Sequence, residues 1–119
     1  MLKFNWFKKR EKPKTWTYEH HNVCKELWSK PQVNWDGMLL GCCVNANKNF
    51  GINVFETGLE RAVSSDLYVY TKKMLQGKVP GIEASPCFHC YLYQQMVKNN
   101  DYFTEEEIQE LLDNKNKCF

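Results

Sequence analysis

The stretch Pro86-Cys87-Phe88-His89-Cys90-Tyr91 contains two cysteines separated by two residues. It leads directly into a segment, Tyr91 to Lys98, that we expect to be helical. Two thiolates at this spacing can bind one metal ion or one iron–sulfur cluster from a single turn of the chain. A complete site needs more ligands than two. The other ligands must therefore come from elsewhere in the sequence, and the fold must bring them to this turn.

The length and composition of the chain indicate what class of protein it is and in which compartment it occurs. The chain has 119 residues, which predicts one domain, and it has six cysteines. The chain reaches the basic run Lys8-Lys9-Arg10 before the apolar region of a secretory signal peptide could form. No stretch approaches the ~20 apolar residues of a membrane span. We therefore expect a cytoplasmic protein whose clustered cysteines stay reduced and bind metal. The pI of about 8.2 argues against a nucleic-acid binder, which usually has a pI above ~9.

Residues 32–44 have the pattern of a β-hairpin. Polar and apolar residues alternate over 32–35, and Asp36-Gly37 supplies the positive-φ residues of a tight type I′ turn. Residues 38–44 then form the return strand. The sequence thus predicts a small two-stranded sheet near the start of the fold.

Two adjacent cysteines lie in the return strand. Because successive side chains of a strand point to opposite faces, Cys42 and Cys43 face opposite sides of the sheet. Only one of them can readily reach a metal that also binds Cys24. The other is expected to be a buried small hydrophobic residue.

The remainder of the chain is predicted to be mostly helical. A short helix covers Glu56 to Ala62, and a longer one, capped by Ser64 or Ser65, covers Asp66 to Gln76 and ends at Gly77. The apolar face expected for the longer helix consists of Leu67, Tyr70, Met74 and Leu75. A last helix begins with a capping box from Thr104 to Glu107. The fold class is therefore α+β: a small β-hairpin followed by helices, organised around a four-cysteine site.

Charge divides the chain into three parts. Residues 1–19 form a basic N-terminal arm, residues 20–100 the metal- or cluster-binding domain, and residues 101–119 an acidic C-terminal helix and tail. We expect the acidic helix to pair with the basic arm. The adjacent His20 and His21, at the start of the binding domain, are interpreted as solvated side chains rather than ligands.

The candidate ligands are four thiols, with two weaker alternatives: Cys24, Cys42, Cys87 and Cys90, then Cys43 and His89. Four thiolates suit either tetrahedral zinc or an iron–sulfur cluster. Zinc ribbons usually bring two Cys-x-x-Cys turns, whereas this chain has one and two isolated cysteines. A 4Fe–4S cluster is larger than a single ion and accepts scattered ligands more readily. Four bulky residues near the cysteines would exclude water from the site or equally serve as ordinary core residues: Trp28, Trp35, Phe88 and Tyr91.

The order of these residues resembles a known family. Cys24, twelve residues, Gly37, four residues and Cys42 are similar to the opening motif of SPASM and twitch domains, the auxiliary-cluster modules at the C-termini of many radical SAM enzymes. The resemblance covers about residues 22–96. It continues through Trp28 and Pro31, the turn Trp35-Asp36-Gly37, the pair Cys42-Cys43, the segment Phe50 to Glu56, a helix ending near Gly77, and Cys87-x-x-Cys90.

Two departures from the family pattern refine what the resemblance implies. A full SPASM domain continues with Cys-x5-Cys-x3-Cys, whereas only Cys118 follows Cys90 here. The chain therefore looks like the one-cluster twitch form, in which Cys24, Cys42, Cys87 and Cys90 would hold one 4Fe–4S cluster. The radical SAM core motif, Cys-x3-Cys-x2-Cys, does not occur in this sequence. We therefore do not expect the chain to act as an enzyme on its own.

Two classes of function follow. The resemblance implies a stand-alone cluster-binding module that transfers electrons or serves as an accessory, substrate-engaging partner of a radical SAM-type system. Its partner would be a radical SAM enzyme or a redox protein. The alternative is a zinc-stabilised structural or protein-interaction module with no redox role.

Overall fold

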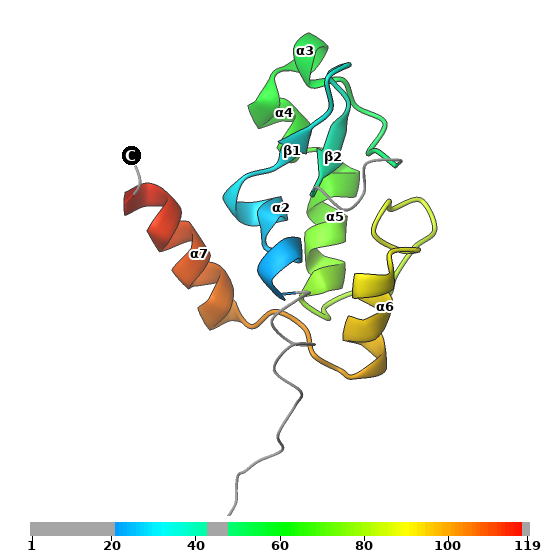
Figure 1. The fold of residues 1–119 in the computed structure, drawn as a ribbon, viewed down its shortest axis with the longest axis vertical. Coiled ribbons are helices and arrows are strands. Elements are labelled where there is room, and N and C mark those ends of the chain that lie inside the picture. The colour runs from blue at the N-terminus through cyan, green and yellow to red at the C-terminus, as the bar shows by residue number, and fades with distance from the viewer. Residues whose placement is uncertain (1–20, 43–47, 118–119) are drawn as a thin grey trace, which may run out of the picture.

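The fold is α+β, with a two-stranded antiparallel hairpin and helices, as predicted (Figure 1). The computed structural model describes residues 21–42 and 48–117, with side chains up to residue 114. The basic arm, Cys43 and Cys118 lie outside the described residues, so the predicted pairing of arm and acidic helix does too. Residues 21–24 are helical, and the elements that follow are α2 (Glu26–Ser29), β1 (Gln32–Val33), β2 (Leu39–Gly41), α3 (Val54–Thr57), α4 (Leu59–Val63), α5 (Asp66–Leu75), α6 (Tyr91–Lys98) and α7 (Glu105–Lys117).

The hairpin is shorter than predicted, and its turn is of a different type. Val33 pairs with Leu39 across the two strands. The N–H of Asn34 donates to the carbonyl of Met38 over 2.9 Å, and the N–H of Gly37 donates to the carbonyl of Asn34 over 2.9 Å. Gly37 has a φ of 96°, but Asp36 is not in the positive-φ region, so the type I′ prediction is wrong. The turn instead has three residues and a left-handed glycine at its end, the next most common hairpin connection.

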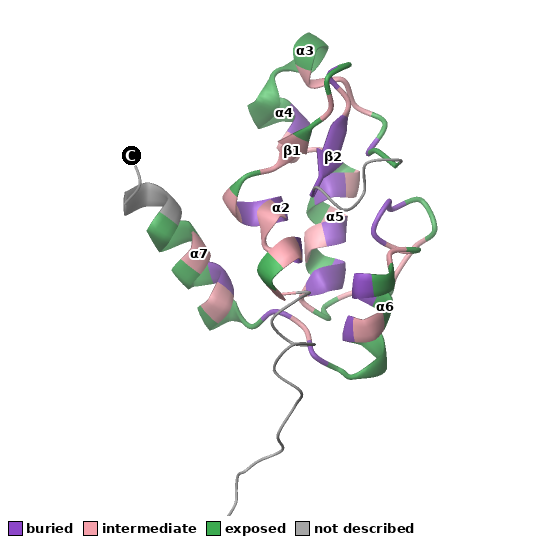
Figure 2. Ribbon diagram, in the orientation of Figure 1, coloured by how far each residue is buried: buried purple, intermediate pink, exposed green. Residues whose placement is uncertain are grey.

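A third extended segment lies along the other edge of β2. The N–H of Leu39 donates to the carbonyl of Ile52 over 3.0 Å, and the N–H of Phe50 donates to the carbonyl of Leu39 over 2.9 Å. Asn53 then caps α3 by accepting a hydrogen bond from the N–H of Phe55. This cap starts α3 at Val54, two positions before the predicted helix. With a partner on each edge, β2 is fully buried, as Figure 2 shows.

Helix α5 supplies much of the core. Its buried residues are Tyr68, Thr71, Met74 and Leu75, so half of the predicted apolar face is confirmed. Leu67 and Tyr70, the other predicted members, are only partly buried and pack against the core from its margin. In the view of Figure 1, α5 lies between α2 and α6. Gly77 follows α5 with a φ of 72°, the left-handed ending that the sequence predicts.

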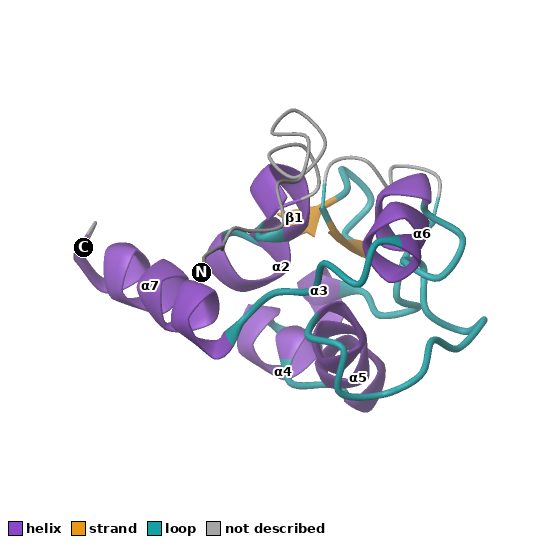
Figure 3. Cartoon of the chain, turned by 90° about the horizontal axis from the view of Figure 1, so that it is seen from below, coloured by secondary structure: helices purple, strands orange, loops and turns teal. Residues whose placement is uncertain are grey.

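The last two helices match the sequence pattern closely. Helix α6 has the predicted bounds. The capping box of α7 is confirmed, because Thr104 N–H donates to Glu107 Oε1 over 2.8 Å and Glu107 N–H donates to Thr104 Oγ1 over 3.1 Å. Helix α7 lies beside α2 in both Figure 1 and Figure 3, and its Ile108 joins the core. Among the described residues, no helix combines the length and the apolar character needed to cross a membrane.

Candidate four-cysteine site

The four predicted ligands come from three separate segments of the chain. Cys24 ends the first helical residues, Cys42 directly follows β2, and Cys87 and Cys90 lie in the loop before α6. Cys24, Cys42 and Cys87 are 5%, 2% and 4% exposed and belong to one hydrophobic core, against which the half-buried Cys90 packs. All four are thiols rather than halves of a disulfide. The turn that carries Cys90 is therefore the side of this group nearest to solvent.

The other three thiols influence the charge state of Cys24. Burial raises the pKa of the Cys24 thiol well above its ordinary value, and the charges of Cys87, Cys42 and Cys90 raise it further, in that order. Cys24 thus lies in one region with all three of the other predicted ligands. Without a bound cation its thiol stays protonated at neutral pH, because a buried thiolate beside other thiolates is unfavourable. Among residues 21–42 and 48–117, no three His, Cys, Asp or Glu side chains form a group suited to a single metal ion.

Helix α5 fixes the Cys-x-x-Cys turn through a pair of buried hydroxyls. The hydroxyls of Thr71 and Ser85 lie 2.7 Å apart, and that of Ser85 accepts a hydrogen bond from the N–H of Cys87 over 3.2 Å. The turn is closed by the N–H of Cys90, which donates to the carbonyl of Cys87 over 3.1 Å. Sequence reasoning missed Thr71 and Ser85. The signal for Ser85 was its place two residues before a cysteine, where a serine hydroxyl can cap a turn.

A close approach at Gly41 brings Cys42 towards the core. Gly41 has a φ of 87°, and a Cβ added there would lie 2.9 Å from the ring of Phe50 and 3.5 Å from the side chain of Leu27. Only glycine combines that backbone conformation with that proximity. The end of the hairpin therefore reaches α2 closely, and Cys42 follows in the next position.

Tyr68 links α5 to the segment that carries Cys24. Its hydroxyl donates to the carbonyl of Leu27 over 2.8 Å in a buried position, and its ring meets that of Phe50 edge to face at 4.8 Å. The residue four positions after Leu27 is Pro31, which has no N–H to offer this carbonyl. Burial, followed by the charges of Cys87 and Cys42, raises the pKa of Tyr68. The tyrosine therefore lies close to the site as well as to α2.

The bulky residues predicted to shield the site do so only in part. Trp28 is buried and Phe88 is half-buried, but Trp35 is 87% exposed and Tyr91 is 57% exposed. Trp35 occupies the hairpin turn, away from the strand residues that enter the core. The prediction of a water-excluding role is therefore wrong for Trp35 and Tyr91. The core that contains three of the thiols is instead built by residues of α2, β2, α5 and α6, together with Phe50, Phe103 and Ile108.

His20 lies outside the described residues, and the two described histidines differ: one is a surface residue and the other connects two elements. His89 is exposed and meets Phe88 edge to face at 4.9 Å. The prediction that His21 is solvated is wrong: its side chain is 15% exposed, and its ring stacks on Phe103 at 4.5 Å. Its Nδ1 lies 2.8 Å from a carboxylate oxygen of Glu107. His21 therefore ties the start of the described chain to α7.

Comparisons of the chain with known protein families, with curated proteins and with solved structures give no match. The interpretation of this site therefore depends on the residues themselves. What they offer is four thiols from three segments, gathered in an apolar core with one of them at its margin.

Proposed function

We propose that this chain binds one 4Fe–4S cluster through Cys24, Cys42, Cys87 and Cys90. The observation that carries the proposal is the burial of Cys24, Cys42 and Cys87 in one core, against which Cys90 packs. Four cysteine thiolates are the usual donor set of such a cluster. The order of the motifs, which resembles that of twitch domains, gives the proposal independent support.

The arrangement of the ligands favours a cluster over a single zinc ion. With Zn–S bonds of about 2.3 Å, the four sulfurs of a tetrahedral zinc site stand only about 3.8 Å apart. The sulfurs that bind a cubane stand farther apart because the cluster itself separates them. Ligands from a helix end, a strand end and a turn suit this larger group. A zinc-stabilised interaction module is the outcome against which the proposal is tested.

In this proposal the chain's own residues control access to the site. Cys24, Cys42 and Cys87 lie in a core that excludes water, whereas Cys90 is half-buried. A bound cluster would supply a one-electron redox centre. A partner would approach it from the turn that carries Cys90, because this turn is closest to solvent. We infer that the module transfers electrons or acts as an accessory, substrate-engaging partner of a radical SAM-type enzyme.

The test is the iron and sulfide content of single cysteine variants of the full chain, purified without oxygen. We expect about four irons and four sulfides per chain in the unaltered protein. Serine at position 24, 42, 87 or 90 is expected to lower both contents strongly. Cys118→Ser is the matched control and should leave both contents unchanged. One zinc per chain without sulfide, or a Cys118→Ser effect equal to that of Cys87→Ser, would contradict the assignment.

A further inference from the structure

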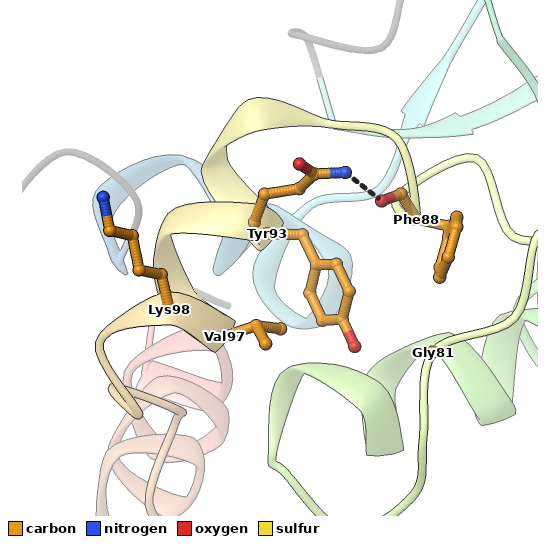
Figure 4. A pocket seen from close by; sticks show the side chains of 6 residues that line it. Gly81, Phe88, Tyr93, Val97 and Lys98 are labelled. Carbon is orange, nitrogen blue, oxygen red and sulfur yellow. Dashed lines mark hydrogen bonds between the residues drawn. The ribbon is translucent and has the colours of Figure 1, made fainter.

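A groove lies next to the Cys-x-x-Cys turn, on the side formed by α6. Its volume is about 330 Å³, within the range of small-molecule sites in proteins. Figure 4 shows its lining, which comes from the loop before the turn, the turn itself and one face of α6: Gly81, Phe88, Tyr93, Gln94, Val97 and Lys98.

The groove contains a hydroxyl group that has no hydrogen-bond partner among the described residues. Tyr93 is only 6% exposed, and in Figure 4 its hydroxyl points into the space between Val97 and Gly81. The hydroxyls of Tyr68 and Tyr70 donate to backbone carbonyls, whereas no residue in the described ranges forms a hydrogen bond with that of Tyr93. A hydroxyl that faces an open groove can donate to a group that enters the groove. A ligand with an acceptor oxygen would satisfy it.

The walls of the groove are apolar, and one of them depends on a glycine. The ring of Phe88 and the side chain of Val97, which is 45% exposed, face the space. A Cβ at Gly81 would lie 2.9 Å from a ring carbon of Phe88 and 2.9 Å from the hydroxyl of Tyr93. Gly81 therefore allows the ring and the hydroxyl to approach the same point. The side-chain amide of Gln94 donates to the carbonyl of Phe88 over 3.3 Å and holds the turn against α6.

The charge at the rim of the groove indicates that the ligand is an anion. Of the six lining residues, Lys98 alone is charged, and it lies in the last turn of α6. Figure 4 shows its ammonium turned away from the Tyr93 hydroxyl. Its flexible four-carbon stem lets the ammonium swing towards an anion in the groove. A hydroxyl donor and a mobile cation together favour a carboxylate.

We propose that this groove binds a small organic acid with an aromatic or branched apolar body. The carboxylate accepts a hydrogen bond from the Tyr93 hydroxyl and faces Lys98, while the body packs on Phe88 and Val97. This site is separate from the four-cysteine site and does not require a bound cluster. Because Phe88 lies between Cys87 and Cys90, the ligand would nevertheless contact the turn that carries two of the proposed cluster ligands.

The test is an NMR titration of the full, isotope-labelled chain with phenylacetate. We expect saturable shifts of the backbone amides of Gly81, Phe88 and Val97. Phenethylammonium has the same ring and a chain of opposite charge, and it should bind at least tenfold more weakly. Tyr93→Phe should weaken phenylacetate binding about tenfold, the usual effect of losing a hydrogen bond to a charged group. Lys98→Met should weaken it and reduce its dependence on salt.

Two matched variants serve as controls. Tyr91→Phe removes a hydroxyl from an exposed tyrosine of the same helix, and Lys73→Met removes an exposed charge from α5. Both should bind phenylacetate as the unaltered chain does. Equal affinity for phenethylammonium, unchanged affinity in Tyr93→Phe, or shifts confined to residues outside the groove would each overturn the proposal.

Discussion

The hydrogen bond from Tyr68 to Leu27 joins α5 to α2, the helix that follows Cys24. Tyr68→Phe removes the hydroxyl and leaves the ring in place. Tyr68 is 0% exposed and Leu27 is 1% exposed, so water cannot readily replace the lost donor. Pro31 cannot replace it either, because it has no N–H. The carbonyl of Leu27 is then buried without a partner.

The expected loss of stability in Tyr68→Phe follows from the burial of the Leu27 carbonyl. Leaving one buried acceptor unsatisfied lowers the free energy of unfolding by about 1–3 kcal/mol. The matched control is Tyr70→Phe, since the hydroxyl of Tyr70 donates to the carbonyl of Pro80 over 2.7 Å in an exposed position. Water replaces that bond, so the control should lose no more than about 0.5 kcal/mol. The assay is urea denaturation without oxygen, comparing proteins of equal metal content.

The comparison of the two tyrosine variants can refute this reasoning. A large effect in Tyr68→Phe and a small one in Tyr70→Phe, with the same dependence on urea, is the predicted result. If both variants lose less than about 0.5 kcal/mol, the Tyr68 hydroxyl does not contribute as its burial implies. If the slope with urea changes in Tyr68→Phe, the variant has altered the folded or unfolded state more broadly.

Three further predictions concern the turn, the link to α7 and alkaline pH. Gly37→Ala should lower the free energy of unfolding by about 2–3 kcal/mol in urea denaturation, since φ is 96° and the new Cβ would displace the side-chain oxygen of Asn53 that caps α3. Gly51→Ala, where φ is 75° but the new Cβ would meet no other atom, should lower the free energy of unfolding by only about 1 kcal/mol. Equal losses in the two variants would show that the contact made at position 37 has no effect. His21→Ala should lose about 1–2 kcal/mol because its ring no longer meets Glu107, and unchanged stability would refute this link. The pKa of Tyr93 is raised above its ordinary 10.0 by burial and then by the charges of Tyr102, Tyr70 and Cys87. The neutral hydroxyl therefore contributes its full stabilisation below about pH 10, and this contribution is lost as the pH rises further. Tyr93→Phe should therefore reduce the loss of stability between about pH 9 and pH 11, and an identical pH profile would contradict the assignment.

Local sequence signals predicted several elements of the fold correctly. Asp36-Gly37 marked the hairpin turn, Gly77 marked the end of α5, and Thr104 with Glu107 marked the start of α7. Each signal acts through backbone conformation or a hydrogen bond within a few residues. Such interactions can be predicted without knowing what packs nearby.

Contacts between distant segments were not predictable in the same way. The segment that includes Ile52 pairs with β2, and nothing in its own sequence indicates β2 as the partner. His21 meets Glu107, 86 positions away, and nothing local to His21 indicates this partner. For the candidate site, the spacing of Cys87 and Cys90 gave the turn. The buried hydroxyls that fix it come from a helix and a loop whose proximity depends on the tertiary fold.

Native mass spectrometry of the full chain, purified without oxygen, tests the central proposal most directly. It reports in one measurement both the identity and the number of bound atoms. We expect a mass increase equal to one 4Fe–4S cluster, which disappears in Cys24→Ser and persists in Cys118→Ser. A mass increase equal to one zinc ion in the unaltered chain, also lost in Cys24→Ser, would contradict the cluster and establish the structural zinc site in its place.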